Sequence, residues 1–550
     1  MGISDFDRAT SLARLATEEF DVLIVGGGIT GVGCALDAAS RGLRTALVER
    51  DDFASGTSSK SSKLIHGGIR YLQQREYKLV YESLLERQIA LRNAPHLVRV
   101  LPFLIPILSK DGLINRKIAR ALGAAMWMYD LTGGLRIRKA HKRINRGEAL
   151  AHMPELRSKN VSSAYIYYDG EADDARLTLA IARTAAANGA VVANGASVTE
   201  LIGGGETPVS GARVKADGQV FDVRARIIIN ATGVWADEIR TLDEHTDPNS
   251  IRPAKGIHIT VPWGKIRNDI AVVLPVAKDR RSIFVVPWGN TTYIGTTDTD
   301  YEDGVEEPQC TDQDVEYLLT AINAAIKEPL TKDDVIGTWA GLRPLLRQAD
   351  SERTADLSRR HGIRVSASGV ITITGGKLTT YRRMASDTID AASRELNQKT
   401  KCRTKNLPLI GADGFKPSMS SHNGSTDPEF HLTSRYGSES KKIKDLVAGD
   451  PRLGKPLVAG LPYLRAEAIF AVRYEMAQDI DDVLDRRTRA RLLARDATSA
   501  AAIDVGNLIG PELGWDEAEI TRRVCAYQES ITAEREAAHL PETLLPSDLT

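Results

Sequence analysis

The chain has 550 residues, of which 42% are hydrophobic and 26% charged, and this length is too great for a single hydrophobic core. Lys plus Arg and Asp plus Glu each number 72, so the formal net charge is zero, which excludes a chain-wide field that attracts nucleic acid. The absence of C-x-x-C spacing disfavours a zinc ribbon, a thioredoxin motif and a disulfide scaffold, and we expect a reducing, cytoplasmic setting without a metal site. The four cysteines are Cys34, Cys310, Cys402 and Cys525.

The N-terminal segment has mixed charge and lacks the long apolar stretch of a signal peptide. No uninterrupted run of about 18 apolar residues occurs anywhere in the chain. We therefore expect no membrane-spanning helix, although attachment to a membrane surface is compatible with this composition.

The first predicted elements form a βαβ unit. The apolar run Val22–Val25 predicts a buried parallel strand, an alanine-rich helix follows and ends near Gly42, and Thr45–Val48 predicts a second buried strand. Such a unit at the start of a domain is typical of dinucleotide-binding α/β folds.

Glycines occupy the turn between the first strand and the helix. Gly26, Gly28 and Gly31 satisfy G-x-G-x-x-G, a spacing that permits a tight turn, close approach of backbone to a pyrophosphate and packing of helix on strand. Glu49 follows the second strand, where its carboxylate can accept from ribose hydroxyls and would repel a 2′-phosphate. The motif disfavours NADP but does not by itself separate FAD from NAD.

A loop rich in hydroxyl groups follows, SGTSSKSSKLIHGGIRYL, at Ser55–Leu72. Short hydroxyl side chains and glycines let a chain pass close to a second phosphate and a flat ring. Composition alone also permits a solvated polar loop. The candidate cofactor contacts are Thr57, Ser58, Ser61, Ser62, Lys63 and His66.

Farther along, the pattern changes. Residues 173–233 predict a second α/β block, whereas SIFVVPWGNTTYIGTTD (282–298) predicts antiparallel strands joined by a Pro-Trp-Gly-Asn turn. This order predicts a nucleotide-binding domain interrupted by a β-rich domain. Residues 411–428 are rich in Gly, Ser, Pro and Asp and predict a linker to a helical region. In that region, apolar residues at helical spacing predict one helix face: Ile469, Val472, Met476, Ile480 and Val483.

Several motifs resemble, in type and order, those of the FAD-dependent glycerol-3-phosphate dehydrogenases of the aerobic, respiratory type. Many flavoproteins share the glycine motif, whereas SSKLIHGGIRYL together with GGKLTTYR is specific. The motifs span about residues 20 to 385 and include GGGITGVG, YDGEADDARL, NATGVW, KGIHITV, VVPWGNTTYIGTTDTD and GLRPLL.

The resemblance implies a Rossmann-like α/β FAD-binding domain with an inserted antiparallel β-rich substrate domain, as in D-amino-acid oxidase, and an all-α C-terminal domain. The predicted limits are 18–95, 165–250 and 345–400 for the FAD-binding domain, 96–164 and 251–344 for the substrate domain, 411–428 for the linker and 429–540 for the helical domain.

The implied activity is oxidation of sn-glycerol 3-phosphate to dihydroxyacetone phosphate, with hydride transfer from C2 to FAD and electrons passed to a membrane quinone. No His or Cys stands out as an attachment point, so we expect noncovalent FAD. The Gly375–Gly376 turn precedes a predicted helix whose positive dipole end would stabilise an anionic flavin. Besides the loop residues, the expected cofactor contacts are Gly26, Gly28, Gly31, Glu49, Gly233, Gly376, Lys377, Leu378 and Thr379.

The phosphate of this substrate requires cations, and oxidation at C2 requires a base. His258 in KGIHITV is the candidate base, although a lone histidine on a strand is also often a core residue. Arg343 offers an alternative, in which it holds the developing alkoxide and water takes the proton. The candidate phosphate ligands are Arg70, Arg343, Arg359 and Lys377.

The stretch from Asn115 to Arg146 suits an anionic membrane surface, because it has nine Lys or Arg and one Asp. We expect peripheral attachment to the inner face of the cell membrane; inward packing of the apolar stripe on this helix is the alternative. No nucleic-acid partner is expected, and a homodimer is possible. The stripe consists of Ile118, Leu122, Ala125 and Tyr129, with Trp127 nearby.

Three other functions stay open. An oxidase would pass the electrons to oxygen, which the basic stretch disfavours. An amine or amino-acid oxidase would need one carboxylate ligand, whereas this chain offers several cations suited to phosphate. A flavin-binding regulator would use the helical tail as an interaction module.

Overall fold

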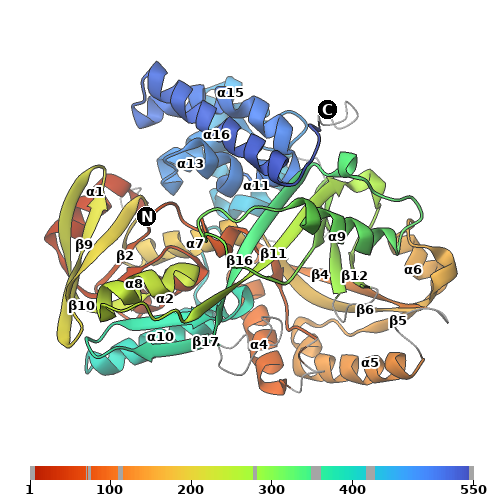
Figure 1. Cartoon of the computed structure of the whole chain (residues 1–550), viewed down its shortest axis with the longest axis horizontal. Helices are drawn as coiled ribbons and strands as arrows, with labels where there is room; N and C mark the ends of the chain where they lie inside the picture. The colour runs from red at the N-terminus through yellow and green to blue at the C-terminus, as the bar shows by residue number, and fades with distance from the viewer. Residues whose placement is uncertain are drawn as a thin grey trace.

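The computed structural model describes residues 6–69, 71, 76–108, 116–276, 282–347, 361–415 and 428–543. It has an α/β region at the left of Figure 1, a β-rich region at the right and a group of helices above both. These three regions confirm the predicted fold class. Within the described ranges, no helix combines the length and apolar character needed to cross a bilayer.

The first sheet has eight strands in the order β17-β18-β10-β1-β2-β7, and β9 joins β8 to β10. The five strands from β18 to β7 pair in parallel. Their order places the sequence-distant β10 directly beside β1, as in doubly wound nucleotide-binding folds. The strands are β1 (Glu19–Val25), β2 (Thr45–Val48), β7 (Val191–Ala193), β8 (Ala196–Gly204), β9 (Thr207–Ala216), β10 (Gln219–Asn230), β17 (His361–Val365) and β18 (Ile371–Gly375).

Helices cover both faces of this sheet. α2 (Ile29–Ser40), α7 (Asp174–Ala187) and α10 (Tyr381–Glu395) share one buried apolar cluster with the strands. α1 (Arg8–Thr17) and α8 (Ala236–Glu244) contribute to the cluster on the other face. Because both faces are covered, every residue of β1 except the first is buried, which explains the uninterrupted apolar run Val22–Val25.

The second sheet has ten strands in the order β15-β11-β14-β13-β12-β4-β6-β3, with β16 on β11 and β5 on β6. The predicted hairpin is confirmed, since β13 and β14 pair antiparallel across residues 289–290. The strands are β3 (Leu64–Ile65), β4 (Val98–Leu108), β5 (Lys142–Asn145), β6 (Val161–Ala172), β11 (Ile251–Pro262), β12 (Ala271–Pro275), β13 (Ser282–Trp288), β14 (Thr291–Gly295), β15 (Thr299–Asp300) and β16 (Gly337–Leu346).

Helices also cover this second sheet. α9 (Asp312–Asn323) and α6 (Arg146–His152) pack in one of its apolar clusters. α4 (Tyr77–Asn93) and the C-terminal part of α5 (Arg116–Tyr129) pack in another, and both helices lie along the lower edge of the molecule (Figure 1).

Three strands of the ten-stranded sheet depart from the predicted domain limits, and one of them is β16, which runs two residues past the limit at residue 344. β3 and the second half of β6 fall in ranges predicted for the FAD-binding domain, yet they pair with each other in the ten-stranded sheet. β6 continues through residue 165 because it pairs with β4 along nearly the whole length of both strands. The other domain limits stay predictions.

The helices after residue 428 have an apolar core of their own. One predicted helix face is wrong in part: α13 ends at Glu475, where Met476 takes φ +54°, and a π-helical turn covers residues 482–487. Asp482 accepts from the amides of Gln478 (2.6 Å) and Asp479 (3.1 Å), bonds that compete with a continuous helix. The helices are α11 (Pro428–Tyr436), α12 (Ser440–Gly449), α13 (Arg465–Glu475), α14 (Ala490–Leu493), α15 (Arg495–Leu513) and α16 (Glu517–Ala537).

Candidate active site

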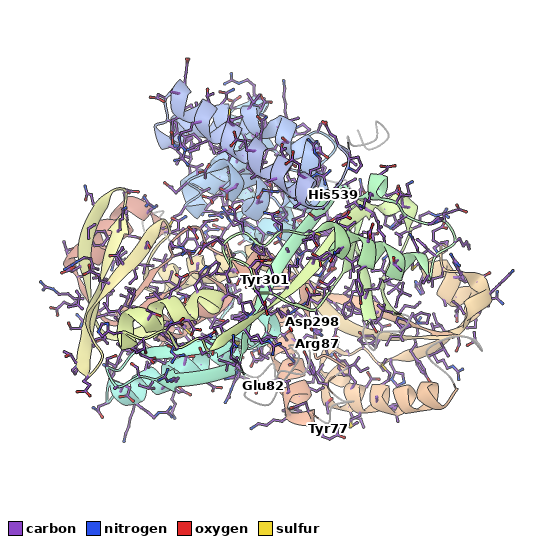
Figure 2. The ribbon with its side chains drawn as sticks, in the orientation of Figure 1. Tyr77, Glu82, Arg87, Asp298, Tyr301 and His539 are labelled. Carbon is purple, nitrogen blue, oxygen red and sulfur yellow. The ribbon has the colours of Figure 1, made fainter. Side chains whose placement is uncertain are left out.

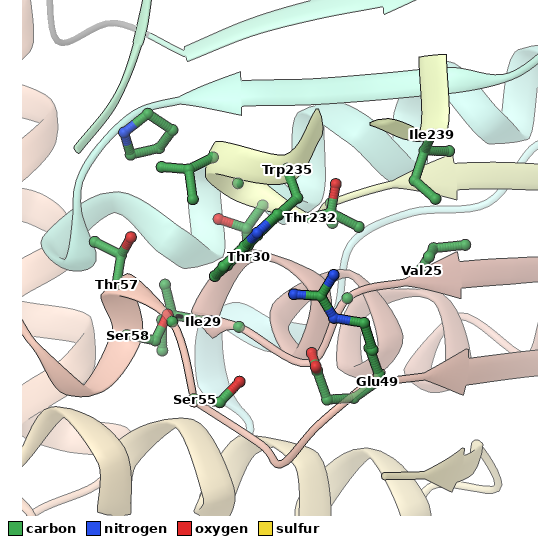
Figure 3. A pocket seen from close by; sticks show the side chains of 18 of the residues that line it. Val25, Ile29, Thr30, Glu49, Ser55, Thr57, Ser58, Thr232, Trp235 and Ile239 are labelled. Atoms are coloured by element: carbon green, nitrogen blue, oxygen red, sulfur yellow. Dashed lines mark hydrogen bonds between the residues drawn. The ribbon is translucent and has the colours of Figure 1, made fainter. Parts of the chain in front are cut away.

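A cavity of about 240 Å³ opens at the carboxyl ends of the parallel strands. Val25 at the end of β1, Glu49 after β2 and Thr232 after β10 surround it (Figure 3). Gly375 at the end of β18 completes this edge. Ligands of open α/β sheets bind at this edge, where strand order reverses.

The glycine turn leaves no room for side chains. Gly26 has φ +110°, and a Cβ on Gly31 would lie 1.9 Å from the Gly26 carbonyl oxygen. The Ile29 amide, at the start of α2, donates to Ser58 Oγ at 2.8 Å. The other first-turn amides of α2 have no partner within the helix, so they and the positive helix end face a ligand placed at this turn.

The Glu49 carboxylate accepts hydrogen bonds from two backbone amides. The Gly27 amide donates to its Oε2 at 2.5 Å and the Asp51 amide to its Oε1 at 2.9 Å. Burial raises the pKa of Glu49 to about 7, an effect that the two amides partly offset. The carboxylate therefore fixes the glycine turn against the end of β2 and keeps further lone pairs for a ligand.

The cavity brings together many of the predicted cofactor residues. Those in its lining are Gly26, Gly28, Glu49, Thr57, Ser58, Ser61, Gly233, Gly376, Lys377 and Leu378. The predicted residues outside its lining are Gly31, Ser62, Lys63, His66 and Thr379. Gly31 acts by letting α2 approach the strand rather than by lining the cavity.

Trp235 is a lining residue that sequence reasoning missed. A Cβ on Gly56 would lie 2.8 Å from its ring, so the loop after β2 packs directly on the indole. Arg50 lies 5.2 Å above the same ring, and Trp235 Nε1 donates to Glu306 at 2.9 Å. The NATGVW motif, which ends in this tryptophan, was the signal that could have identified it.

The second glycine turn places Lys377 at the cavity. Gly376 has φ +85°, and a Cβ there would lie 2.3 Å from Met384 Sδ. Lys377 lies 3.9 Å above the Tyr71 ring and donates to Ser83 Oγ at 3.4 Å. Thr379 Oγ1 accepts from the His66 amide at 3.0 Å, so the start of α10 is tied to the hydroxyl-rich loop.

Two loop serines bind protein groups. The Ser61 hydroxyl donates to Asp174 Oδ2 at 2.7 Å, and the buried Lys63 pairs with the same carboxylate at 3.2 Å. Ser62 Oγ lies 2.9 Å from His258 Nε2. These contacts hold the loop against the ten-stranded sheet and α7.

Arg343 on β16 occupies space left by a glycine. A Cβ on Gly256 would lie 2.3 Å from its guanidinium. Its Nη1 donates to Asp298 and its Nη2 to Thr296 Oγ1, each at 3.2 Å. Asp298 lies near the centre of the molecule (Figure 2). Pro344, the next residue, lines the cavity.

His258 on β11 is buried, with 2% exposure. Its ring stacks on Trp339, with centroids 4.5 Å apart and planes 9° apart. Its Nδ1 has no hydrogen-bond partner among the residues that the structure describes. Burial, then the charges of Lys63 and Arg343, lower the pKa of His258 well below its usual value, so the ring is neutral at neutral pH.

Arg70 and Arg359, two of the four predicted phosphate ligands, lie outside the described residues. Of the four predicted phosphate ligands, the structure therefore describes Arg343 and Lys377. They come from β16 and from the turn between β18 and α10, on opposite sides of the boundary between the two sheets.

The features of the cavity fit FAD. A helix N-terminus that begins in a glycine turn suits the pyrophosphate, and the Glu49 carboxylate suits ribose hydroxyls. Trp235 and the glycine turns offer flat surfaces and close backbone approach.

Comparisons with known proteins show the family of the chain. The family model for FAD-dependent oxidoreductases matches residues 21–382, and the model for the C-terminal domain of α-glycerophosphate oxidase matches residues 402–520. Glycerol-3-phosphate dehydrogenase 2 of Mycobacterium tuberculosis is 42% identical over 537 residues, covering 96% of this chain and 90% of that protein. The human mitochondrial glycerol-3-phosphate dehydrogenase is 38% identical over 567 residues, covering 97% and 77%.

Solved structures give the same result. The FAD complex of glycerol-3-phosphate dehydrogenase from Bacillus halodurans has a TM-score of 0.77 and 30% identity, covering 99% of this chain and 100% of that one. L-α-glycerophosphate oxidase from Mycoplasma pneumoniae, at 19% identity and a TM-score of 0.54, shows the fold alone. FAD is the cofactor, as predicted, and the chain belongs to the family of FAD-dependent glycerol-3-phosphate dehydrogenases.

Proposed function

We propose that the protein oxidises sn-glycerol 3-phosphate to dihydroxyacetone phosphate and passes the electrons to a membrane quinone. The observation that supports this most is a dinucleotide-type turn and the ammonium group of Lys377 at one cavity, with Arg343 adjacent in sequence to its lining. A guanidinium and an ammonium together suit a phosphoester dianion.

When bound, FAD supplies the acceptor for the hydride that leaves C2 of the substrate. Arg343 and Lys377 bind the phosphate and thereby orient C2. Because Asp298 and two threonine oxygens already fix the Arg343 guanidinium, little conformational freedom is lost on binding.

His258 is proposed to accept the proton of the C2 hydroxyl at Nδ1. Its neutral ring is fixed between Trp339 and the glycine at position 295. In this proposal Nε2–H donates to Ser62 Oγ at 2.9 Å, and the lone pair of Nδ1, which has no partner among the described residues, takes the proton. The substrate dianion would oppose the positive charges of Lys63 and Arg343, which favours protonation of the imidazole during turnover.

Anaerobic titration of the FAD-loaded protein with sn-glycerol 3-phosphate tests the activity. We expect the flavin absorbance to bleach and one dihydroxyacetone phosphate to form per flavin, whereas glycerol, which lacks the phosphate, leaves the spectrum unchanged. A flavin that stays oxidised with the phosphoester would contradict the proposed reaction.

The proposed membrane contact is the α4–α5 surface, which we define as Tyr77, Tyr81, Trp127, Met128 and Leu131. All five side chains are exposed, Trp127 at 62% and Leu131 at 69%. The helices adjoin, since a Cβ on Gly133, directly after α5, would lie 2.6 Å from Leu84 of α4. Tyr77 projects from the lower edge of the molecule (Figure 2).

This surface differs from the predicted stripe. Tyr129 is 1% exposed and donates to Asp169 at 2.7 Å, and Ala125 is partly buried. The side chains of Ile118 and Leu122 lie outside the described residues. The described stripe residues therefore pack inward, as the alternative had it, and the exposed apolar groups are their neighbours in sequence.

Reoxidation of the reduced flavin distinguishes the acceptors. In stopped-flow mixing, we expect a soluble quinone to reoxidise the bleached protein much faster than dissolved oxygen does. Faster reaction with oxygen, accompanied by peroxide, would instead identify an oxidase.

A further inference from the structure

The β2–β3 loop, residues 49–63, forms one side of the cofactor cavity. The residues that it contributes to the lining are Glu49, Arg50, Asp51, Ser55, Gly56, Thr57, Ser58 and Ser61. Its course includes only one 3-10 turn, at Thr57–Ser59. Because the loop has so little secondary structure, its course along the cavity depends on contacts with other parts of the chain.

The start of the loop is held by the C-terminal helical domain. Asp52 is 3% exposed, and Arg487 donates to its two carboxylate oxygens at 2.6 and 2.8 Å. Arg486 Nε donates to the same carboxylate at 2.6 Å. Asp52 lies three residues after Glu49, whose carboxylate closes the glycine turn.

The end of the loop is held by the same segment of that domain. Arg489 Nη2 donates to the Ser59 carbonyl oxygen and, at 3.2 Å, to Asp174 Oδ1. Asp174 Oδ2 accepts from the amide and hydroxyl of Ser61, at 3.0 and 2.7 Å. Lys63 Nζ donates to the Ser59 carbonyl oxygen at 3.2 Å, so backbone and side chains of the loop share one network with Arg489.

Burial of the arginine side chains that make these contacts costs free energy, because charged groups lose their hydration. Arg487 and Arg489 are each 1% exposed, and the Nε of each has no hydrogen-bond partner within the described part of the chain. Arg489 also takes φ +69°, a left-handed conformation that disfavours side chains with a Cβ. A well-packed apolar pair is often as stable as a buried ion pair, so stability alone does not account for two such arginines.

We propose that Arg487 and Arg489 are positioning residues for FAD: they fix both ends of the β2–β3 loop and so hold the cofactor cavity in its binding shape. The proposal assigns a role to the C-terminal helical domain. It rests on FAD binding in this cavity and on neither the substrate nor the electron acceptor.

Titration of apoprotein with FAD, followed by quenching of flavin fluorescence, tests the proposal on Arg489→Met. The substitution removes the contact to the Ser59 carbonyl and leaves Asp174 paired with Lys63. We expect the FAD dissociation constant to rise about 10-fold, the effect of losing one charge-assisted hydrogen bond to the loop. Arg489→Lys, which keeps the charge, restores part of the affinity.

Arg491→Met is the matched control. Arg491 belongs to the same segment but pairs with Glu534 (2.8 Å) and Asp485 (3.1 Å), both within the helical domain. We expect a lower melting temperature and an unchanged FAD dissociation constant. Equal weakening of FAD binding by Arg489→Met and Arg491→Met would overturn the proposal, because general loosening of the domain would then explain both.

A second variant covers the case in which Arg489→Met does not fold. Asp52→Asn keeps the shape of the side chain and removes the charge that Arg487 binds, and we expect the same weakening of FAD binding. An unchanged dissociation constant in the folded variants, with normal bleaching by sn-glycerol 3-phosphate, would overturn the positioning role while leaving the proposed reaction intact.

Discussion

The proposed site residues Glu49, Arg343 and His258 lie in surroundings with little solvent. Glu49 has two amide partners, Arg343 is fixed by an aspartate and threonine oxygens, and His258 stacks on an indole. Burial shifts the pKa of Glu49 upward and that of His258 downward, toward the neutral form of each.

The shift of Glu49 predicts a pH dependence of apoprotein stability. Its pKa is raised from 4.5 to about 7, so the folded chain binds a proton more tightly than the unfolded chain. This contribution is complete below pH 4.5 and is lost as the pH rises through about 7, so the free energy of unfolding falls over that interval. Urea unfolding between pH 5 and pH 8, compared with Glu49→Gln, measures it. An identical pH slope in the variant would contradict the assignment.

Substitution of the catalytic candidates tests their roles. We expect His258→Ala to lower kcat by about 10²- to 10⁴-fold, the usual effect of losing a general base, with FAD retained. In the unsubstituted enzyme the acidic limb of the kcat/KM profile should lie below pH 6.5, because burial lowers the pKa of His258. Loss of flavin rather than of turnover would assign His258 a structural role.

Arg343→Ala is expected to act mainly on substrate binding. The variant should retain FAD and raise KM for sn-glycerol 3-phosphate by about 10-fold or more, since it removes a charge-assisted contact to phosphate. Steady-state kinetics over a wide substrate range separates KM from kcat. An unchanged KM would place the phosphate away from Arg343.

At the residue scale, the sequence predicted chemistry better than contact partners. The spacing of Gly26, Gly28 and Gly31 was sufficient because backbone sterics alone determine it. For Ser62, composition indicated a polar contact, but its partner, His258, lies 196 residues away in sequence. Such a pairing depends on how the two sheets meet, which no local pattern contains.

Helices and strands formed as the sequence predicted where local interactions determine them. They differed from the prediction where contacts with distant parts of the chain determine them. The hairpin of β13 and β14 needs only a turn and alternating residues, and it formed as predicted. α13 stops at Glu475 even though the apolar spacing continues, because Asp482 binds the amides after it. Ile480 and Val483 are still buried. The apolar spacing therefore predicted the burial of these side chains correctly, whereas the single continuous helix that it predicted was wrong.

The α4–α5 surface yields a prediction for the helices that carry it. We expect the double substitution Trp127→Ser and Leu131→Ser to weaken sedimentation with anionic vesicles at least several-fold, with normal turnover on a soluble acceptor, because about 25 cal/mol per Å² of apolar contact is lost. Ile503→Ser on α15, which removes another exposed apolar side chain (53%) from the helical domain, is the control. Equal vesicle binding by all three proteins would exclude this surface.

Across the whole molecule, buried ion pairs join the helical domain to the FAD-binding domain. Arg176 on α7 donates to Glu475 at 2.7 Å, and Arg183 pairs with Glu439. Arg435 donates to Asp173 at 2.9 Å. All these side chains are at most 11% exposed, so separation of the two domains would break several buried ion pairs.

Glu475→Gln is therefore expected to destabilise the whole molecule by about 3–5 kcal/mol, the cost of an unpaired buried charge. Circular dichroism and flavin release in urea should give coincident midpoints, as one cooperative unit requires. Glu512→Gln, which breaks the partly exposed Arg473–Glu512 pair (2.6 Å), should cost only about 1 kcal/mol or less. Separate transitions for the helical and flavin signals would show that the domains unfold independently.

The cavity for FAD is assembled from three stretches of chain, 25–61, 196–239 and 344–384. A ribosome makes them in that order, with most of the ten-stranded sheet translated in between. Flavin incorporation therefore follows translation of the third stretch, and a premature stop codon before codon 384 yields a product without a complete flavin site.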